Sequence, residues 1–323
     1  MKKAFILHQK LKADAPPDEL DVLEQARAIK HALKELGYRS GLIPVSLNLE
    51  QLKNTIVKDK PDVVVNLVET LDGQGRLIYL VAALLEFMEV PFTGSGQHGL
   101  NITTGKIMAK EEMLKAGLPT PGYFPSAQWK QLHSAKKYIL KPVWEDASVG
   151  ILDESVVSLQ TAKQALEKAL QSGINEWFFE EYIDGREFNV TLLETREGWK
   201  VFTPAEILFV GYPDDKPKIL GYESKWFDES FEYKSTPRTY DFGAKDRKLI
   251  SELKEISLKC VELFKLRGYV RVDFRVDIKN RPAILEINAN PCLSPDAGFF
   301  AACRHAGMDY TEMIGHIIES AYK

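Results

Sequence analysis

The sequence predicts an α/β protein (α+β) of more than one domain, with an open parallel unit first and antiparallel sheets after it. The chain has 323 residues, and at ~100–200 residues per domain this length suggests two or three domains. Strand and helix signals alternate through about the first ninety residues, a pattern typical of a parallel sheet covered by helices. From Arg186 onward, long alternating strands dominate.

The N-terminal unit is recognised by its hydrophobic periodicity. Lys2–His8 is expected to form a short buried strand, and Asp18–Gly37 an amphipathic helix with a glycine as its stop. Residues Pro61–Val68 form a continuous β-branched run, which is typical of a strand buried on both faces. The other elements expected here are strands at Gly41–Val45 and Val90–Thr93 and helices at Leu49–Lys58 and Leu77–Met88.

The rest of the chain contains a proline-rich connector at 118–125, which indicates a nearby boundary. Before it, Lys106–Ala116 is expected to be a helix that Gly117 ends. After it, Tyr212–Ala244 shows little regular period, and so long a segment is more often functional than idle. The strands expected in this part are Tyr138–Val143, Trp177–Ile183, Glu187–Thr195, Lys200–Val210, Tyr269–Asp277 and Pro282–Asn288, and the helices are Thr161–Gln171, Asp246–Arg267 and one from Tyr310.

The composition excludes several classes of protein. Lys and Arg total 42 against 46 Asp and Glu, so the net charge of −4 leaves no basic excess for nucleic acid. The longest apolar run, Leu77–Leu85, is far shorter than the ~20 residues that span a bilayer. The N-terminus has only a short apolar stretch, too short for a signal-peptide core, and the three cysteines show no pattern. We therefore expect a cytoplasmic enzyme that binds neither nucleic acid nor membrane.

Two glycine-containing segments are spelled like nucleotide-binding motifs. Gly94–Gly99 reads GxGxxG, but it follows several elements instead of the first strand of a βαβ unit, so a glycine-rich turn is the favoured interpretation. Gly99–Ile107 resembles a P-loop, but its spacing is one residue too long and Ile107 stands where Ser or Thr is required. Neither segment decides the function, and a nicotinamide oxidoreductase rests on the first one alone.

Two strands near the C-terminus predict a hairpin with polar side chains on one face. The run YVRVDFRVD alternates strictly, so Arg271 and Asp273 share a face, and in PAILEIN the side chains of Glu286 and Asn288 do so too. A turn centred on residues 279–280 would set Asp273 opposite Glu286 and Arg271 opposite Asn288. Directly opposed Cβ atoms lie ~4.5–5.5 Å apart.

Two interpretations fit this polar face. The oxygen atoms of Asp273, Glu286 and Asn288 suit Mg²⁺, and Arg271 beside them could neutralise an anionic intermediate. Alternating charge is also common on a solvated sheet face, which needs no ligand. The loop that follows, ANPCLSP, is framed by two prolines and favours the metal interpretation, because a site needs irregular backbone of this kind.

Seven segments together resemble the ATP-grasp superfamily, and within it the D-alanine–D-alanine ligase branch. They come in the order and at about the spacing of that family and cover nearly the whole chain; each one alone is weak evidence. The segments are VPFTGSG (90–96), TTGKIMAKEEMLKAGLPTP (103–121), YILKPVWEDASVGI (138–151), FFEEYIDGREFNV (178–190), GYESKW (221–226), RVDF (271–274) and LEINANP (285–291).

The resemblance implies a three-domain ATP-grasp fold with ATP held between two antiparallel β-sheet domains. It places an N-terminal α/β domain on the substrate side at 1–98, a central domain at 99–184, and a C-terminal domain with the metal and catalytic residues at 185–323. It also implies an ATP-dependent ligation with Mg²⁺ (or Mn²⁺), in which ATP phosphorylates a carboxylate and an amine displaces the phosphate. The implied partners are small molecules, and a homodimer is a possible assembly.

The resemblance also assigns roles by position. Lys225 is expected to reach the transferred γ-phosphate, Arg271 to stabilise the tetrahedral intermediate, and residues 144–150 to form a mobile loop over the triphosphate. Lys141 supports this reading independently, because a bare lysine fits poorly in the apolar strand YILKPV. The implied ATP contacts are Lys106 and Lys141 at the phosphates, Ser148 in the loop, Glu180, Glu181 and Ile183 at the adenine and Glu187 at the ribose, and the implied metal ligands are Asp273, Glu286 and Asn288.

The substrate side departs from the family pattern. The acidic segment that usually follows the first strand has no evident counterpart, and the serine and tyrosine of the same hydrogen-bonded network fall at Ala147 and Trp226. Glu69 offers a replacement carboxylate, although a helix-start acid is an equally good interpretation. Ser294 lies in LSPDAGF, which replaces the family's stretch for the second substrate's carboxylate. These four residues are the candidate substrate contacts.

The leading hypothesis is therefore a D-alanine–D-alanine ligase-like enzyme with different substrates. Because a buried ammonium needs a carboxylate partner, we expect a first substrate of a different shape or with a less cationic group. A genuine D-alanine–D-alanine ligase and a non-catalytic ATP-binding homologue are the alternatives. The presence of Lys225 and Arg271 argues against the latter, since adenine binding alone does not need them.

Overall fold

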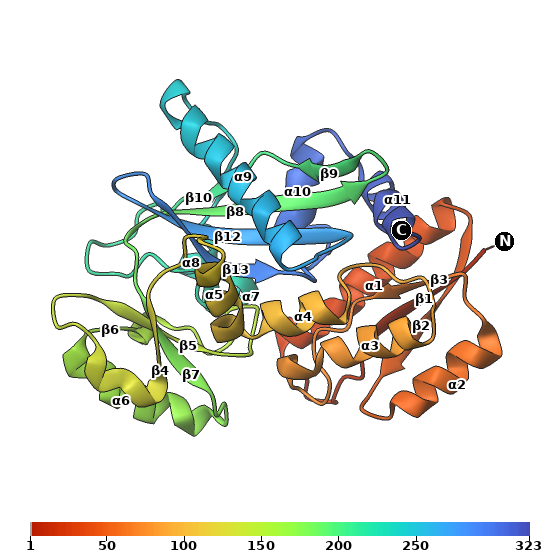
Figure 1. Cartoon of the computed structure of the whole chain (residues 1–323), viewed down its shortest axis with the longest axis horizontal. Coiled ribbons are helices and arrows are strands. Elements are labelled where there is room, and N and C mark those ends of the chain that lie inside the picture. Colours follow the sequence, from red (N-terminus) through yellow and green to blue (C-terminus); the bar gives the residue numbers. More distant parts are fainter. Residues whose placement is uncertain (1) are drawn as a thin grey trace.

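The computed structural model describes residues 2–323, whose strands form three separate sheets (Figure 1). The first sheet is parallel, in the order β2-β1-β3, and consists of β1 (Lys2–Gln9), β2 (Tyr38–Val45) and β3 (Val63–Asn66). The strand expected at Val90–Thr93 is reduced to a single bridge between Phe92 and Val64. Pro91 accepts a hydrogen bond from Val64 there but has no N–H of its own to extend the ladder.

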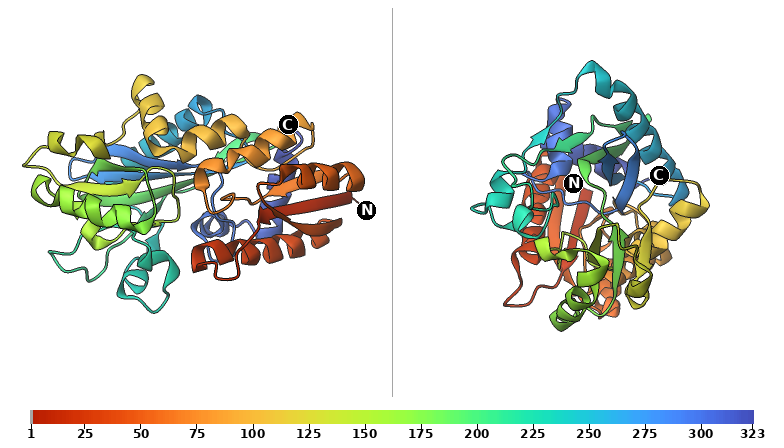
Figure 2. Two further views of the ribbon diagram at one scale, coloured as in Figure 1. Left: turned by 90° about the horizontal axis from the view of Figure 1, so that it is seen from below. Right: turned by 90° about the vertical axis from the view of Figure 1, so that its left-hand side faces the viewer.

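Helices from both ends of the chain cover this sheet. Ala4 and Ile6 of β1 face a core formed with α1, α10 and α11, whereas Phe5 and Leu7 face a core formed with α2 and α3. Figure 2 accordingly shows the C-terminal helices (blue) beside the N-terminal unit (red). The helices are α1 (Pro17–Glu35), α2 (Leu49–Asp59), α3 (Tyr79–Phe87), α10 (Gly298–His305) and α11 (Tyr310–Ser320).

The second sheet is antiparallel and follows two helices that lead away from the N-terminal unit. Its order is β4-β7-β5-β6, and α6 packs on it through a core that includes Leu140, Ala162 and Phe179. The elements are α4 (Gln97–Thr104), α5 (Lys106–Lys115), β4 (Tyr123–Pro125), β5 (Tyr138–Pro142), β6 (Val156–Val157), α6 (Leu159–Ala169) and β7 (Trp177–Glu181).

The third sheet is also antiparallel, in the order β11-β10-β8-β12-β13 with β9 paired to β8. The long strand expected at Lys200–Val210 is broken into β9 and β10, because Pro204 lies between them and cannot donate to a ladder. The elements are β8 (Gly185–Thr195), β9 (Gly198–Val201), β10 (Ala205–Ile207), α7 (Glu223–Trp226), α8 (Phe231–Lys234), β11 (Arg238–Thr239), α9 (Arg247–Leu263), β12 (Tyr269–Asp277) and β13 (Pro282–Asn288).

Short 3₁₀ helices complete the chain at Gly75–Leu77, Ser126–Gln131, Asp153–Ser155, Leu170–Ser172 and Ala244–Asp246. The GxGxxG segment leads into α4, and the segment with P-loop spelling spans α4 and α5. Within residues 2–323 there is no helix whose length and apolar character would let it span a bilayer.

Candidate active site

A cavity of about 360 Å³ lies where the three sheets approach one another. Its lining combines side chains from the first turn of α1, from the loop after β5, from α7 and from the β12–β13 hairpin. Of the residues singled out from the sequence, those that line it are Glu69, Lys106, Lys141, Ala147, Ser148, Glu180, Glu181, Ile183, Glu187, Lys225, Trp226, Arg271, Asp273, Glu286 and Asn288.

The hairpin has the register that its alternation predicts. Asp273 pairs with Glu286, and Arg271 pairs with Asn288. A β-bulge follows, because Phe274 pairs with Ile284 and leaves Leu285 as an extra residue. The bulge centres the turn on Lys279 instead of between residues 279 and 280, and the polar pairs lie before it and keep the expected register. Both pairs therefore face the cavity.

Charge is concentrated around the two hairpin carboxylates. Arg271 holds Asp273 in a two-point ion pair, with Nε–Oδ1 and Nη2–Oδ2 distances of 2.8 and 2.7 Å, and Asn189 donates to Asp273 as well. Burial raises the pKa of Glu286, but the charges of Lys106, Lys225 and other cations outweigh it and hold this pKa at about 2. Glu286 is therefore ionised at neutral pH.

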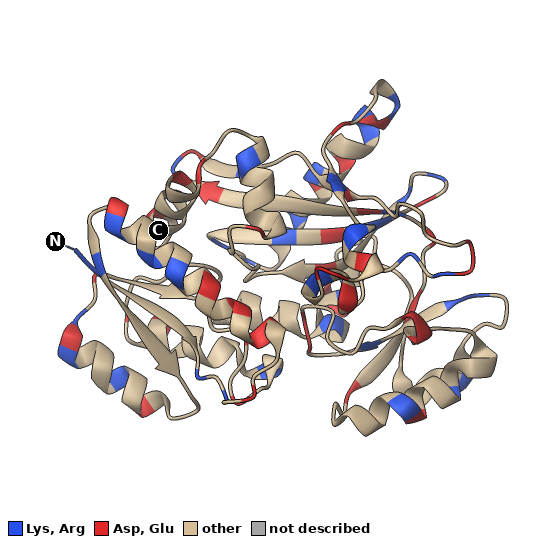
Figure 3. Cartoon of the chain, turned by 180° about the vertical axis from the view of Figure 1, so that it is seen from behind, with Lys and Arg blue, Asp and Glu red and all other residues tan. Residues whose placement is uncertain are grey.

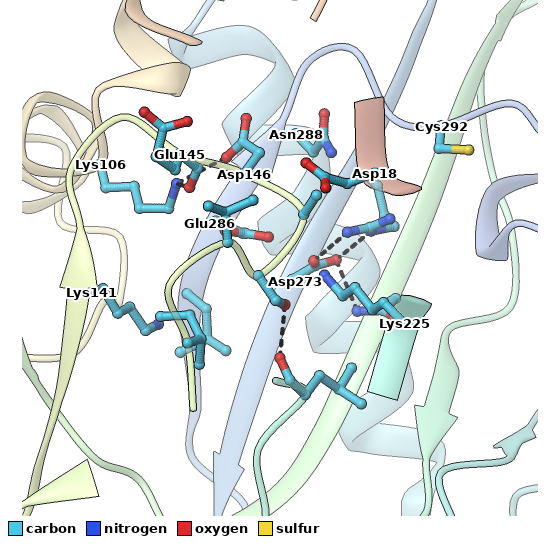
Figure 4. Close-up of a pocket in the computed structure, with 18 of the residues that line it drawn as sticks. Asp18, Lys106, Lys141, Glu145, Asp146, Lys225, Asp273, Glu286, Asn288 and Cys292 are labelled. Atoms are coloured by element: carbon cyan, nitrogen blue, oxygen red, sulfur yellow. Dashed lines mark hydrogen bonds and ion pairs between the residues drawn. The ribbon is translucent and has the colours of Figure 1, made fainter. Parts of the chain in front are cut away.

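Three lysines point towards this hairpin from different elements (Figure 4). Lys106 is the first residue of α5, and its Nζ donates to the Glu145 carbonyl (2.6 Å) and to Asp146 Oδ1 (2.9 Å). Lys225 lies in α7, where burial lowers its pKa. Lys141 comes from β5. Three ammonium groups around one space form a surface suited to a polyphosphate.

Glu180 is buried between two lysines, of which the sequence reasoning found only one. Its side chain is 1% exposed and lies 2.5 Å from both Lys141 Nζ and Lys110 Nζ. Lys110 is equally buried and also donates to Thr120 Oγ1. Burial alone would raise the pKa of Glu180, but the two lysines outweigh this effect and hold the pKa below its usual value. The carboxylate therefore stays charged. The spacing of Lys110, one helical turn after Lys106, was the available signal.

Glu187, Glu181 and Ile183 extend the cavity along β7 and β8. Glu187 forms a buried ion pair with Arg275 Nη2 at 3.2 Å, and burial raises its pKa. Arg275 also donates to the carbonyl of Gly185 and lies on the polar face of β12, so the alternation already indicated its position. Glu181 lies at the rim, where it pairs with an exposed lysine, Lys136.

The loop between β5 and the following 3₁₀ helix is held in a tight conformation. Ala147 and Ser148 have φ angles of +55° and +63°, which residues other than glycine rarely adopt. Ser148 Oγ donates to the Leu220 carbonyl at 2.7 Å, and Trp226 Nε1 donates to the Ala147 carbonyl at 3.1 Å. The two candidate substrate residues Ala147 and Trp226 are thus in contact, and Trp226 fastens the loop to α7.

The N-terminal side corrects one sequence expectation. Asp18 and Glu19, in the first turn of α1, line the cavity, so acidic residues do follow the first strand. The hydroxyl of Tyr222 donates to Asp18 Oδ1 at 2.5 Å, so an acid–tyrosine pair is present as well. Neither partner was predicted, because Tyr222 precedes the aligned position, Trp226, by four residues.

Of the other two candidate substrate residues, Glu69 lines the cavity and Ser294 does not. Glu69 follows β3 and precedes a 3₁₀ helix that begins only at Gly75, so it is not a helix-start acid. Burial, together with the charges of Asp21 and neighbouring acids, raises the pKa of Glu69 to about 8. Ser294 does not line the cavity; it is buried behind it and donates to Asp21 Oδ1 at 2.8 Å.

The donor chemistry fits a hard divalent cation. Within the described part of the chain, no group of three His, Cys, Asp or Glu side chains is arranged to hold a metal. Two hairpin carboxylates, Asp273 and Glu286, together with the Asn288 amide nevertheless offer the oxygen atoms that Mg²⁺ takes when phosphates and water complete its shell.

Comparisons of the sequence and of the fold with known proteins agree on one family. The family model described as D-ala D-ala ligase C-terminus matches residues 123–319, more than half of the chain. The chain is 29% identical over 317 residues to the uncharacterized protein y4sG of Sinorhizobium fredii (95% of this chain, 90% of the relative). It is 28% identical over 304 residues to the D-alanine–D-alanine ligase of Aquifex aeolicus (92% and 94%).

The fold also matches a solved structure, the D-alanine–D-alanine ligase of Bacillus anthracis complexed with ATP, with a TM-score of 0.74 at 17% identity over 100% of this chain and 98% of that one. This match confirms the predicted fold class. The family model and the D-alanine–D-alanine ligase relatives, together with this fold, define the protein as an ATP-grasp ligase, which forms a C–N bond and releases ADP. The chain belongs to the D-alanine–D-alanine ligase family. ATP and Mg²⁺ are its cofactors.

Proposed function

We propose that the chain joins a carboxylate to an amine through an acyl-phosphate intermediate and that its substrates are not two molecules of D-alanine. The observation that carries the ligase part is the hairpin register, which sets two carboxylates, an amide and an arginine on one face beneath three lysines. Adenine binding alone does not need such a group of charges, whereas phosphoryl transfer does.

In this proposal ATP lies between the two antiparallel sheets. Glu180 accepts a hydrogen bond from the adenine amino group, and the backbone around Ile183 also contacts the adenine. Glu187 accepts hydrogen bonds from the ribose hydroxyls. The burial of both carboxylates supports this, because a buried acceptor discriminates strongly between ligands that can and cannot donate to it. The phosphates are bound by Lys106, Lys141 and Lys225 and covered by the loop that contains Ser148.

The chemistry is a double displacement in which the protein supplies position and charge. An oxygen of the substrate carboxylate attacks the γ-phosphorus, and the bond to ADP breaks. The amine then attacks the acyl carbon, loses a proton and expels phosphate. Arg271 stabilises the negative charge on the carbonyl oxygen in the second step. Asp273, Glu286 and Asn288 would hold the Mg²⁺, which would neutralise charge on the transferred phosphoryl group.

The substrate part of the proposal rests on the cavity wall around the loop. Where the family places a serine and a tyrosine, this chain has Ala147 and Trp226, and the indole N–H is already used by the Ala147 carbonyl. A bulky aromatic ring with no free polar group favours a different substrate shape. We also propose the domain limits 1–98, 99–184 and 185–323, which assign one sheet to each domain. We further propose that the reaction takes place in the cytoplasm, where ATP is supplied.

A substrate panel tests this proposal. Purified protein, ATP and Mg²⁺ are incubated with pairs of L- and D-amino acids and simple amines, and ADP release and ligated product are measured by coupled assay and mass spectrometry. We expect ADP release that depends on a carboxylate–amine pair other than two D-alanines. A higher kcat/KM for D-alanine with itself than for any other pair would contradict the substrate part, and no ADP release with any pair would contradict the ligase part.

A further inference from the structure

One end of the cavity is formed by the N-terminal unit and is acidic. Asp18, Glu19 and Asp21 come from the start of α1, and Glu69 follows β3. We call these four residues the acidic end. Figure 3 shows most of the acidic residues of α1 (red) at the end of the helix nearest the middle of the molecule. Within residues 2–98 of the described chain, no lysine, arginine or histidine lines the cavity.

The partners of these carboxylates are neutral. Asp21 accepts from Ser294 Oγ (2.8 Å) and from the thiol of Cys292 (3.0 Å). Gln25 Nε2 lies 3.1 Å from both Asp21 Oδ2 and Glu69 Oε1, so it bridges two acids. Asp18 accepts from a tyrosine hydroxyl. Across the described residues, no lysine, arginine or histidine forms an ion pair with any member of the acidic end.

A buried amide beside the acidic end points to a ligand independently. Gln9, at the end of β1, is 3% exposed and lines the cavity. Its Oε1 accepts from the Glu69 backbone N–H, whereas its Nε2 has no partner. A buried donor left without an acceptor is unfavourable, so Gln9 is matched to an oxygen atom that a ligand brings.

Two lysines lie near this region, and neither neutralises it. Lys12 acts on the charge of Glu19 but forms no ion pair with it. Lys106 is committed to the loop, where it binds the Glu145 carbonyl and Asp146. The loop adds two more carboxylates to the same side of the cavity, Glu145 and Asp146. Their effect reaches the acidic end, since Asp146 contributes to the raised pKa of Glu69. Like charges held this close stabilise one another's neutral forms unless a cation lies among them.

We propose that the acidic end binds a protonated amine on the side chain of a substrate, so that one substrate carries an ammonium group beyond those of a simple zwitterion, with an oxygen acceptor placed at Gln9. This inference rests on the proposed ligase function. A zwitterion such as alanine brings one ammonium and cancels it with its own carboxylate, which leaves Asp18, Glu19 and Asp21 without net compensation and gives Glu69 no cation that would favour its ionised form. A basic amino acid or a diamine supplies the missing charge.

Matched ligand pairs test the charge directly. The full chain, loaded with Mg²⁺ and a non-hydrolysable ATP analogue, is titrated by calorimetry with lysine or ornithine and with norleucine, each as both enantiomers. Putrescine and butylamine form a second pair. Lysine and norleucine differ mainly by an ammonium group, so their comparison isolates the charge, and the two pairs distinguish a basic carboxylate substrate from a basic amine substrate.

We expect the member with the additional ammonium group to bind about tenfold or more tightly than the other member in at least one pair. Asp18→Asn and Glu69→Gln should each reduce this preference severalfold, whereas Glu167→Gln, on the exposed side of α6, should leave it unchanged. The second variant replaces a carboxyl that burial already keeps largely protonated, so it should fold normally.

Three results would overturn the inference: equal affinities within both pairs, a preference that survives both acidic-end variants, or displacement of the amine by K⁺ or Mg²⁺ alone, which would make the acidic end an inorganic cation site. ADP release separates this failure from failure of the proposed function. Turnover that is better with the substrates that lack the additional ammonium group leaves the ligase function intact and refutes the proposed role of the acidic end. No turnover despite ATP binding refutes the ligase function.

Discussion

At the scale of single residues, the site is a balance between buried acids and buried bases. Lys141 shares Glu180 with Lys110, so the pair of lysines exceeds the acid by one positive charge. That surplus leaves Lys141 able to bind a phosphate without stripping Glu180 of its counter-charge. Glu69 has no such counter-charge, because its neighbours are acidic or neutral.

Glu69→Gln should remove a pH dependence of stability. Burial, Asp21, Asp146 and Asp18 outweigh the hydrogen bond from Gln25 and raise the pKa of Glu69 from 4.5 to about 8. Between these values the folded chain keeps a proton that the unfolded chain loses, so the wild type loses stability as the pH rises through that window. The variant lacks this loss.

Calorimetric melting from pH 5 to pH 8.5 measures the effect. The Tm of the Gln variant should rise relative to the wild type by several degrees, because a pKa raised from 4.5 to about 8 corresponds to ~4 kcal/mol over this pH range, and the difference should level off above pH 8. A Tm difference that stays constant over this range would show that Glu69 titrates normally.

At the scale of elements, the loop 144–150 is positioned by close packing as much as by hydrogen bonds. A Cβ on Gly75 would lie 2.5 Å from the Trp144 carbonyl oxygen, and one on Gly105 would lie 2.8 Å from the Trp144 ring. The loop therefore lies against the N-terminal unit and against the residue before Lys106. Its two left-handed residues, Ala147 and Ser148, persist because these contacts over-determine their conformation.

Gly75→Ala should weaken nucleotide binding, although Gly75 has no side chain that could contact the nucleotide. The new methyl group meets loop backbone, which cannot move aside as a flexible side chain can, and overpacking of this kind costs ~1–3 kcal/mol. We expect the KM for ATP to rise by about tenfold. Gly243→Ala is the matched control, because nothing lies within 4 Å of its Cβ position and its φ is ordinary. Equal kinetics in both variants would mean that the loop is not held at Gly75.

At the scale of the whole molecule, the cavity depends on contacts between distant parts of the chain. The start of α1 meets Tyr222 and Ser294, which are more than 200 residues away in sequence. Helices α10 and α11 also complete the core of the N-terminal sheet. The N-terminal side of the cavity is thus fixed by C-terminal residues, and it should not form in an isolated N-terminal fragment.

This dependence explains what the sequence could predict. The period-2 alternation set the pairing of Asp273 with Glu286 correctly, because neighbouring strands impose it locally. The bulge at Leu285 had no local signal. The Asp18–Tyr222 pair joins segments far apart in sequence, so no spacing rule reaches it. The break at Pro204, by contrast, was readable from the missing N–H of proline.

The central claim is that opposed carboxylates on the hairpin serve metal-dependent phosphoryl transfer. Glu286→Gln keeps the shape and hydrogen-bonding reach of the side chain and removes its charge. The direct measurement is ADP release as a function of Mg²⁺ concentration, in wild type and variant, with the Tm of both as a control for folding. We predict that kcat falls by roughly 100-fold or more and that half-saturation moves to higher Mg²⁺, while the Tm changes little. An unchanged kcat with an unchanged Mg²⁺ dependence would contradict the account.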